Sequence, residues 1–330
     1  MIITQTPLRV SFFGGGTDYP EYFSQHGGAT IGSTINKFTY VTVSPLTEFF
    51  NHRVRVSYSK TELVGSVDEI QHPSVRECLR FLKIDGGVEI GVLSDLPART
   101  GLGSSSSFTV GLLHALHMFK CELVSHEQLA AEAVHVEREL IKERVGVQDQ
   151  YTCAHGGVCY LQFARTGKIN VTPVPTAPGR LSALQERLMI FYTGQQRTAH
   201  EVLVQQIERT KSGQVNQELG QMTSLVDEGL EVLTDGRDLS DFGELLDQGW
   251  QLKKRLSSSI SNSLVDDAYT AARAKGALGG KLLGAGGGGF LMLYVEPYNQ
   301  PAIRQALVGM KEVRFGFEDQ GSRVVFYQNQ

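Results

Sequence analysis

The stretch Leu96-Pro97-Ala98-Arg99-Thr100-Gly101-Leu102-Gly103-Ser104-Ser105-Ser106-Ser107 determines how the rest of this chain is interpreted. Apolar residues then recur at three- and four-residue steps from Phe108 to Phe119, which predicts an amphipathic helix of about four turns. A glycine loop entering a helix directs backbone N–H groups and the positive end of the helix dipole at one point, an arrangement that suits phosphate. A flexible Gly/Ser connector is the alternative. The shortness of the stretch and the N-cap preference of serine oppose that alternative.

The segment Gly101–Ser107, here called the phosphate loop, is not a Walker A loop. No Gly-Lys-Ser/Thr follows four residues after a glycine. The hydroxyls of Ser104 to Ser106 could add hydrogen bonds or a magnesium ligand. The loop therefore predicts phosphate binding through backbone and hydroxyl groups.

Composition limits the classes of protein that need consideration. The chain has 330 residues, 41% of them hydrophobic and 20% charged, with a net charge of -4. This balance gives no global basic field, so we expect no nucleic-acid partner. No apolar run approaches about 18 residues, so we expect no membrane span. The N-terminus lacks the features of a secretory signal, and the four cysteines form no C-x-x-C spacing. We therefore expect reduced thiols and a cytoplasmic location.

Glycine is in excess, at 36 residues, and much of the excess is clustered. Gly284–Gly289 formally satisfies G-x-G-x-x-G, but it runs into the strand pattern Phe290–Val295, whereas a Rossmann fingerprint opens a helix. A tight turn remains, and by itself it is equally compatible with packing and with a site. Near the start, Arg9 precedes the turn Gly14–Gly16 and Asp18 follows it. Taken alone, an Arg and an Asp at this spacing more often form a surface pair.

Two carboxylates follow the predicted helix of the phosphate loop. Glu137 lies in a helical segment from about residue 127 to 142, and Asp149 comes after a turn at Gly146. The two residues could converge on a metal and a hydroxyl. Taken singly, each is by default a solvated helix charge.

The order of elements predicts an α+β fold with two domains. Strands dominate the first 60 residues, and Val174-Pro175-Thr176-Ala177-Pro178-Gly179 is the best candidate boundary. Beyond it we expect a strand at 188–192, three long helices over 199–275, and two strands flanking the last glycine cluster. The predicted domains are 1–176 and 177–330.

Taken together and in this order, the three glycine-bearing motifs resemble those of the GHMP kinase superfamily. The run from Pro97 to Ser105 matches its middle motif P-x-x-x-G-L-G-S-S. The resemblance covers nearly the whole chain. It implies an N-terminal domain similar to ribosomal protein S5 domain 2, a ferredoxin-like C-terminal domain, and ATP with Mg2+ in the cleft between them.

The resemblance also implies roles for individual residues. Asp149 would be the catalytic carboxylate with Arg9 as the cation beside it, and Ser105 and Glu137 would hold magnesium. A cation beside a carboxylate favours the ionised form that accepts a proton. The residues expected to bind ATP are Pro97, Gly101, Leu102, Gly103, Ser104, Ser105, Ser106 and Ser107. Those expected to bind the substrate are Asp18, Gly15, Gly16, Thr17, Arg197, Gly286 and Gly287.

The first motif indicates the substrate. Galactokinases carry Gly-Glu-His-Thr-Asp-Tyr, whereas this chain has Gly15 and Gly16 in place of Glu and His and keeps Asp18. This variant resembles the D-glycero-D-manno-heptose 7-phosphate kinases, with fucokinases next. It implies phosphorylation of the anomeric hydroxyl to the 1,7-bisphosphate, in nucleotide-heptose and surface polysaccharide synthesis. The phosphate of the substrate needs a cation, for which Arg197, Lys37 and Lys281 are the candidates.

Other readings stay open at this point. The chain could be a fucokinase- or galactokinase-like enzyme, a kinase for a mevalonate-like alcohol, or a sugar-binding member without catalysis. Retention of Arg9, Ser105, Glu137 and Asp149 argues against the last of these. A homo-oligomer is possible in every case.

Overall fold

The computed structural model describes residues 1–98, 100–195 and 199–328. Its larger sheet is built on two long antiparallel strands, β1 (Ile2–Phe13) and β2 (Gly28–Pro45). The strand order is β12-β1-β2-β5-β3-β4, with β6 paired to β2 and β7 paired to β6. The remaining strands of this sheet are β3 (Val54–Ser57), β4 (Thr61–Val64), β5 (Val88–Ser94), β6 (Val158–Phe163), β7 (Ile169–Pro173) and β12 (Arg323–Tyr327).

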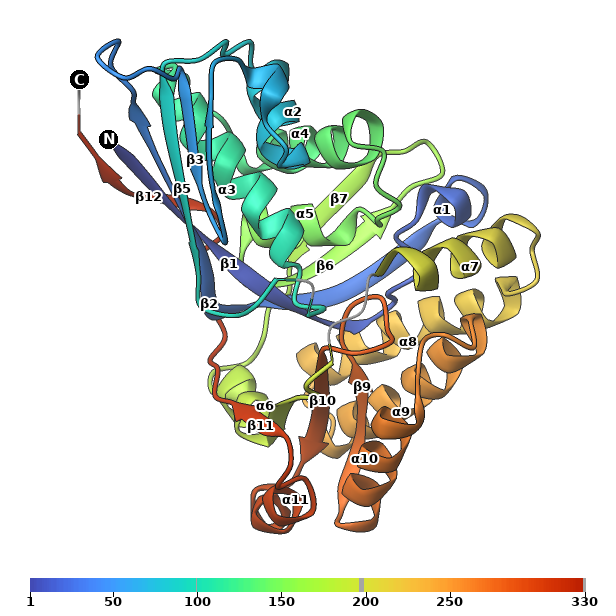
Figure 1. Ribbon diagram of the computed structural model, residues 1–330. Coiled ribbons are helices and arrows are strands. Elements are labelled where there is room, and N and C mark those ends of the chain that lie inside the picture. The colour runs from blue at the N-terminus through green and yellow to red at the C-terminus, as the bar shows by residue number, and fades with distance from the viewer. Residues whose placement is uncertain (99, 196–198, 329–330) are drawn as a thin grey trace.

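One face of this sheet is covered by helices (Figure 1). α3 (Ser104–Phe119) packs directly on β1 and β2, and it contacts α2 (Pro73–Phe81), α4 (His126–His135) and α5 (Gln148–His155). The sequence predicted an amphipathic helix here, and the helix is present. Its environment differs from the prediction, because all residues from Ser106 to Leu113 are buried. The sheet covers one side of α3 and the other helices cover the opposite side, as is typical of a helix in the core.

The smaller sheet contains β8 (Leu188–Tyr192), β9 (Ala277–Leu282), β10 (Phe290–Val295) and β11 (Lys311–Val313). These strands are antiparallel, in the order β11-β8-β10-β9. Numbered along the chain, this is the order 4-1-3-2 of a ferredoxin-like sheet. The strands predicted at 188–192 and 290–295 are confirmed, and so is the α+β class.

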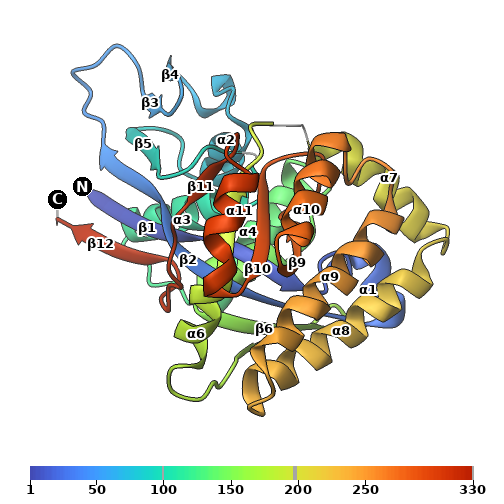
Figure 2. The same ribbon diagram turned by 90° about the horizontal axis from the view of Figure 1, so that it is seen from below.

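The prediction of three helices over 199–275 is wrong, because the described residues form four there. They are α7 (Ala199–Lys211), α8 (Asn216–Thr234), α9 (Leu239–Leu256) and α10 (Ser263–Ala274). Gly213 and Gly236 adopt positive φ in the first two connections, where the apolar periodicity alone does not reveal a break. α8 and α9 lie side by side (Figure 2). The other helices are α1 (Pro20–His26), α6 (Arg180–Arg187) and α11 (Gln300–Ala306).

The two sheets share a hydrophobic core. Leu8, Val10 and Phe12 of β1 belong to the same buried cluster as Ile190 and Met292 of the smaller sheet. The chain then returns to the larger sheet, where β12 pairs with β1. The division after residue 176 stays a prediction. Within the described residues, no helix has the length and apolar character to cross a membrane.

The close packing of α3 against β1 requires a glycine at position 111, in the middle of the helix. A substitution there tests this packing. A Cβ at Gly111 would lie 2.7 Å from Oγ1 of Thr6 on β1. Gly111→Ala should therefore destabilise the protein by about 1–3 kcal/mol, although alanine normally favours a helix. Gly220→Ala in α8 is the matched control, since its Cβ would meet only Tyr22 Oη at 4.0 Å. It should stabilise by about 0.5–1 kcal/mol. Urea unfolding measures both changes.

A double-mutant cycle identifies the cause. Thr6→Ala removes the Oγ1 atom that a Cβ at Gly111 would meet. The cost of Gly111→Ala should be smaller in that background. An equal cost in both backgrounds would contradict the proposed contact.

Candidate active site

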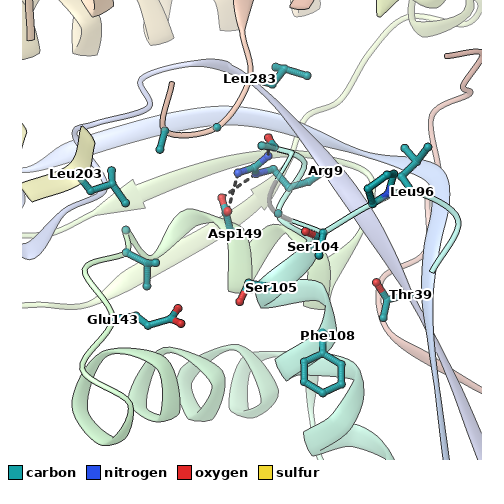
Figure 3. Close-up of a pocket in the computed structure, with 18 of the residues that line it drawn as sticks. Arg9, Thr39, Leu96, Ser104, Ser105, Phe108, Glu143, Asp149, Leu203 and Leu283 are labelled. Atoms are coloured by element: carbon teal, nitrogen blue, oxygen red, sulfur yellow. Dashed lines mark hydrogen bonds and ion pairs between the residues drawn. The ribbon is translucent and has the colours of Figure 1, made fainter. Parts of the chain in front are cut away.

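A cleft of about 1310 Å³ lies where the two halves of the chain meet (Figure 3). One wall is formed by β1, the turn after it, the phosphate loop and the start of α5. The other wall is formed by α9, β9 and the last glycine cluster. The cleft is large enough to hold a nucleotide together with a small second substrate.

Arg9 and Asp149 form a bidentate ion pair in this cleft, drawn with dashed lines in Figure 3. Arg9 Nε donates to Asp149 Oδ1 at 2.7 Å, and Nη2 donates to Oδ2 at 2.6 Å. Burial opposes the charge of Arg9, yet Asp149 raises the pKa of the guanidinium above its ordinary value. The Asp149 side chain keeps 23% exposure. A carboxylate oxygen has more than one lone pair, so Asp149 can also accept a proton from a hydroxyl in the cleft.

The phosphate loop joins this pair at the beginning of α3. Arg9 Nη1 donates to the carbonyl of Gly101 at 2.6 Å. Gly103 is the N-cap of α3 and has no side chain that could cap the helix. Ser104 and Ser105 form the first turn of α3 and line the cleft, so the positive end of the helix dipole faces it. This end of α3 is suited to an anion.

The predicted ATP-binding residues divide into two groups. Pro97, Gly101, Gly103, Ser104 and Ser105 line the cleft. The others hold the loop from behind. Leu102 is buried and its carbonyl accepts from Arg9 N, Ser106 Oγ donates to Glu137, and Ser107 Oγ donates to the carbonyl of Thr6.

Glu137 lies in a π-helical turn, Val136–Leu140, that extends α4. Its Oε2 accepts from Ser106 Oγ at 3.0 Å and from Gln150 Nε2 at 2.5 Å, while Oε1 has no partner among the described residues. Burial raises the pKa of Glu137 to about 7. The structure thus joins Glu137 to Ser106 and not to Ser105, and Glu137 does not line the cleft. No group of three or more His, Cys, Asp or Glu side chains able to hold a metal occurs in the described ranges.

Asp18 is buried and lines the cleft beside the first glycine turn. Its Oδ1 accepts from the N–H of Gly16 at 2.8 Å, and burial raises the pKa of its carboxyl. Gly14 has φ +80°, and a Cβ there would lie 2.0 Å from the carbonyl of Ala29. Gly16 has φ +116°. Gly15 differs from both, because its φ is ordinary and a Cβ would make only 3.5 Å contacts. The backbone therefore requires glycine at 14 and 16 but not at 15.

Thr17 is fully buried behind this turn. Its hydroxyl oxygen lies 2.8 Å from the carbonyl oxygens of both Gly14 and Ala29, which share its single proton, and it accepts from Ala29 N at 3.2 Å. These partners are all backbone groups, and Thr17 does not line the cleft. Its hydroxyl holds the turn that presents Asp18.

The last glycine cluster packs against the phosphate loop. A Cβ on Gly284 would lie 2.4 Å from Cα of Gly101, so the two backbones are in direct contact. Gly286 also lines the cleft, whereas Gly287 points its N–H at the carbonyl of Ile260. The cluster is therefore both a packing turn and part of the cleft wall.

The cationic candidates occupy different places. Lys281 lines the cleft, and its Nζ donates to the carbonyl of Phe12 at 2.8 Å. Lys37 is not among the lining residues. Arg197 lies outside the described residues. Sequence reasoning missed Lys253, a buried cleft residue whose Nζ donates to the carbonyl of Gly284. In the sequence, the run Lys253-Lys254-Arg255 looks like any solvated helix C-terminus.

The sequence analysis also did not predict an extension of the cleft lined by aromatic rings, here called the aromatic arm. Tyr58, His72 and Phe108 line it, and the His72 ring lies 5.0 Å from the Tyr58 ring and 5.2 Å from the Phe108 ring. Val92 and Pro97 add apolar surface. The three rings come from separate parts of the chain, so no local pattern reveals them. Such a surface suits a flat ring system.

A helix N-terminus suited to phosphate beside a carboxylate–cation pair is the arrangement expected of a small-molecule kinase. Comparison with known families agrees with this class. Residues 73–157 match the GHMP kinases N terminal domain, and residues 228–309 match the GHMP kinases C terminal domain. The chain belongs to the GHMP kinase family, whose phosphate donor is ATP.

The relatives include proteins named for heptose and fucose. The chain is 28% identical over 325 residues to D-glycero-alpha-D-manno-heptose 7-phosphate kinase of Campylobacter jejuni, covering 93% of both chains. It is 26% identical over 329 residues to a bifunctional fucokinase/GDP-fucose pyrophosphorylase of Arabidopsis thaliana, covering 92% of this chain and 31% of that protein. The crystal structure of a D-glycero-D-manno-heptose 1-phosphate kinase from Bacteroides thetaiotaomicron superposes with a TM-score of 0.79, 22% identity and full coverage of both chains.

The raised pKa of Glu137 predicts a pH dependence of stability without metal. The native pKa of about 7 exceeds that of an unfolded glutamate, so the stabilisation is complete below about pH 4.5 and is lost as pH rises through 7. The free energy of unfolding, relative to Glu137→Gln, should fall by up to about 3 kcal/mol between pH 5 and pH 8. Urea unfolding of both proteins in EDTA measures this. Parallel pH profiles would contradict the assignment.

Proposed function

We propose that this kinase transfers the γ-phosphoryl group of ATP to the anomeric hydroxyl of D-glycero-D-manno-heptose 7-phosphate. The observation that carries the proposal is the Arg9–Asp149 pair beside the N-terminus of α3, next to a turn with a bare Gly15. The name of the Campylobacter jejuni relative supports the choice of sugar. The product would be the 1,7-bisphosphate. It would feed nucleotide-heptose and surface polysaccharide synthesis in the cytoplasm.

The geometry supports a direct route for the reaction. The sugar hydroxyl would donate its proton to Asp149 as its oxygen bonds to the γ-phosphorus, and the bond from that phosphorus to the β–γ bridging oxygen would break, releasing ADP. Arg9 holds both oxygens of Asp149 in place. The N–H groups at the start of α3 would bind phosphate oxygens. Alignment and charge neutralisation are the main requirements of phosphoryl transfer.

Magnesium is part of the proposal, although Glu137 is buried behind Ser106 and does not line the cleft. Glu137 has an unpartnered buried oxygen, Oε1, and the exposed Ser105 stands at the start of α3. Nucleotide-bound Mg2+ takes one or two protein oxygens beside the phosphates and keeps several waters. Ser105 and Glu137 would hold it, and when bound it neutralises charge on the phosphates. Glu137 must be ionised in this role.

The two ends of the cleft suit the two substrates. The aromatic arm of Tyr58, His72 and Phe108 would receive the adenine. At the other end, Asp18 would accept hydrogen bonds from sugar hydroxyls, and Gly15, Gly16 and Gly286 would let the sugar approach bare backbone. Of the residues proposed for the 7-phosphate, Lys281 lines the cleft.

A panel of sugars tests the substrate. The purified protein with ATP and Mg2+ should release ADP fastest with D-glycero-D-manno-heptose 7-phosphate, compared with L-fucose, D-galactose and mevalonate. Preference for fucose would favour the alternative that the Arabidopsis thaliana relative suggests. That result would overturn the heptose assignment and leave the kinase intact. No turnover with any acceptor would favour a sugar-binding member without catalysis.

The same ADP-release assay, applied to Asp149→Asn, tests the catalytic role of Asp149. The substitution should lower kcat by about a hundredfold or more, because asparagine cannot accept the hydroxyl proton. Binding of ATP, measured by calorimetry, should change little. Unchanged turnover would remove Asp149 from the catalytic role.

Gly15 offers a test of acceptor choice. Gly15→Ala should fold with unchanged stability, because a Cβ there makes only ordinary contacts. The added methyl occupies cleft space, so kcat/KM for the heptose phosphate should fall about tenfold while KM for ATP stays constant. Gly14→Ala is the contrast and should destabilise the protein, since its Cβ would collide with the carbonyl of Ala29. Full activity of Gly15→Ala would mean that the acceptor does not approach this turn.

A further inference from the structure

Lys253 is a buried cation to which neither the family motifs nor the mechanism above gives a role. It lies in the last turn of α9, and the residue is 6% exposed. Burying an ammonium group is costly unless it is paired. Within the described residues, Lys253 has no carboxylate within ion-pair distance, and its hydrogen bond goes to the carbonyl of Gly284. An ammonium group has three donors, so this contact leaves two.

The neighbouring lysine behaves differently. Lys254 lies 3.7 Å from Asp266 and stacks over Trp250 at 5.8 Å, and its side chain is 31% exposed. Its charge is accounted for by surface contacts. The comparison shows that Lys253 is not simply one more basic residue at a helix C-terminus.

Lys253 sits at the same backbone junction as Arg9. Arg9 donates to the carbonyl of Gly101, Lys253 donates to the carbonyl of Gly284, and these two glycines touch. Both cations line the cleft. They therefore approach the phosphate loop from its two sides, one from each half of the chain.

The charged groups facing Lys253 keep it available to an anion. Burial, and to a smaller extent Arg9, lower the pKa of Lys253 to about 8 against the opposing effect of Asp18 and Asp149. The remaining neighbour is Lys281, whose pKa burial lowers well below the ordinary value. With a pKa of about 8, Lys253 is mostly charged at neutral pH. A buried cation facing a cleft is suited to the anion that enters it.

We propose that Lys253 is a further catalytic residue, whose ammonium group donates to the phosphoryl group during its transfer. The proposal rests on the kinase activity. As the acceptor oxygen bonds to the γ-phosphorus and ADP leaves with the electrons of the broken P–O bond, the hydroxyl proton passes to Asp149. Lys253 neutralises the equatorial oxygens and exchanges no proton. The phosphate loop carries no lysine, and Lys253 would supply that charge from the opposite wall.

Lys253→Met tests this role, with Lys254→Met as the matched control. The assay uses whichever sugar the wild type turns over fastest, so failure of the heptose assignment changes the acceptor but not the test. Lys253→Met should lower kcat by about 100- to 1,000-fold, with KM for the sugar and the Kd of ADP changed less than about threefold. Lys254→Met should stay within about twofold of the wild type in all three. An unchanged kcat, or a loss confined to KM for the sugar, would overturn the proposal.

A pH profile separates catalysis from a structural role. In the wild type, kcat/KM for ATP should fall as pH rises through about 8, because the charged form of Lys253 is lost. Lys253→Met should lack this alkaline limb. If that variant does not fold, Lys253→Arg serves instead and should move the limb to higher pH, since arginine stays charged. A wild-type profile that is flat between pH 7 and 9.5 would contradict the proposal, as would a limb that persists in both variants.

Discussion

The bidentate pair between Arg9 and Asp149 is the interaction on which the site depends. Arg9 is buried on strand β1, and a guanidinium in that position is tolerated only with a partner. Its donors reach Asp149 on α5 and the carbonyl of Gly101 in the phosphate loop. One side chain therefore fixes a carboxylate, a loop and a strand relative to one another, and removing either charge leaves the other buried and unpaired.

The second constraint is the close approach of two glycine loops. Gly101 and Gly284 are in backbone contact, and a Cβ on Gly289 would lie 2.3 Å from the carbonyl of Thr100. Side chains at these positions would push the two halves of the chain apart. The shared core around β1 then holds the halves together. The carbonyls of these two glycines, Gly101 and Gly284, accept hydrogen bonds from Arg9 and Lys253. The contact that packs the two halves together therefore also places two cations at the cleft.

Much of the fold and part of the site could be predicted from local patterns. The strands β8 and β10 follow from short β-rich runs, and the start of α3 follows from the Gly-Ser sequence before a periodic helix. The environment of α3 could not be predicted, because burial on all sides depends on which elements cover it. Four helices, α7 to α10, fill the range in which three were predicted, since single glycines such as Gly213 and Gly236 in polar sequence do not identify a turn. Arg197 lies beyond the described residues and stays a prediction.

The sequence alone determined the chemistry available to this protein: a phosphate loop without a lysine, a carboxylate and an arginine far apart in the chain, and glycines wherever backbone must approach closely. These features depend on residue type and on spacing along the chain, so they can be predicted from local sequence patterns. Only the tertiary structure decided which groups meet. In the fold, Glu137 is buried against Ser106 and Lys253 lies in the cleft. Thr17 stabilises the first glycine turn through its hydroxyl and does not face the cleft. The reason is that burial and pairing are set by contacts between segments distant in sequence, and these contacts decide whether a charge is solvated or faces a substrate.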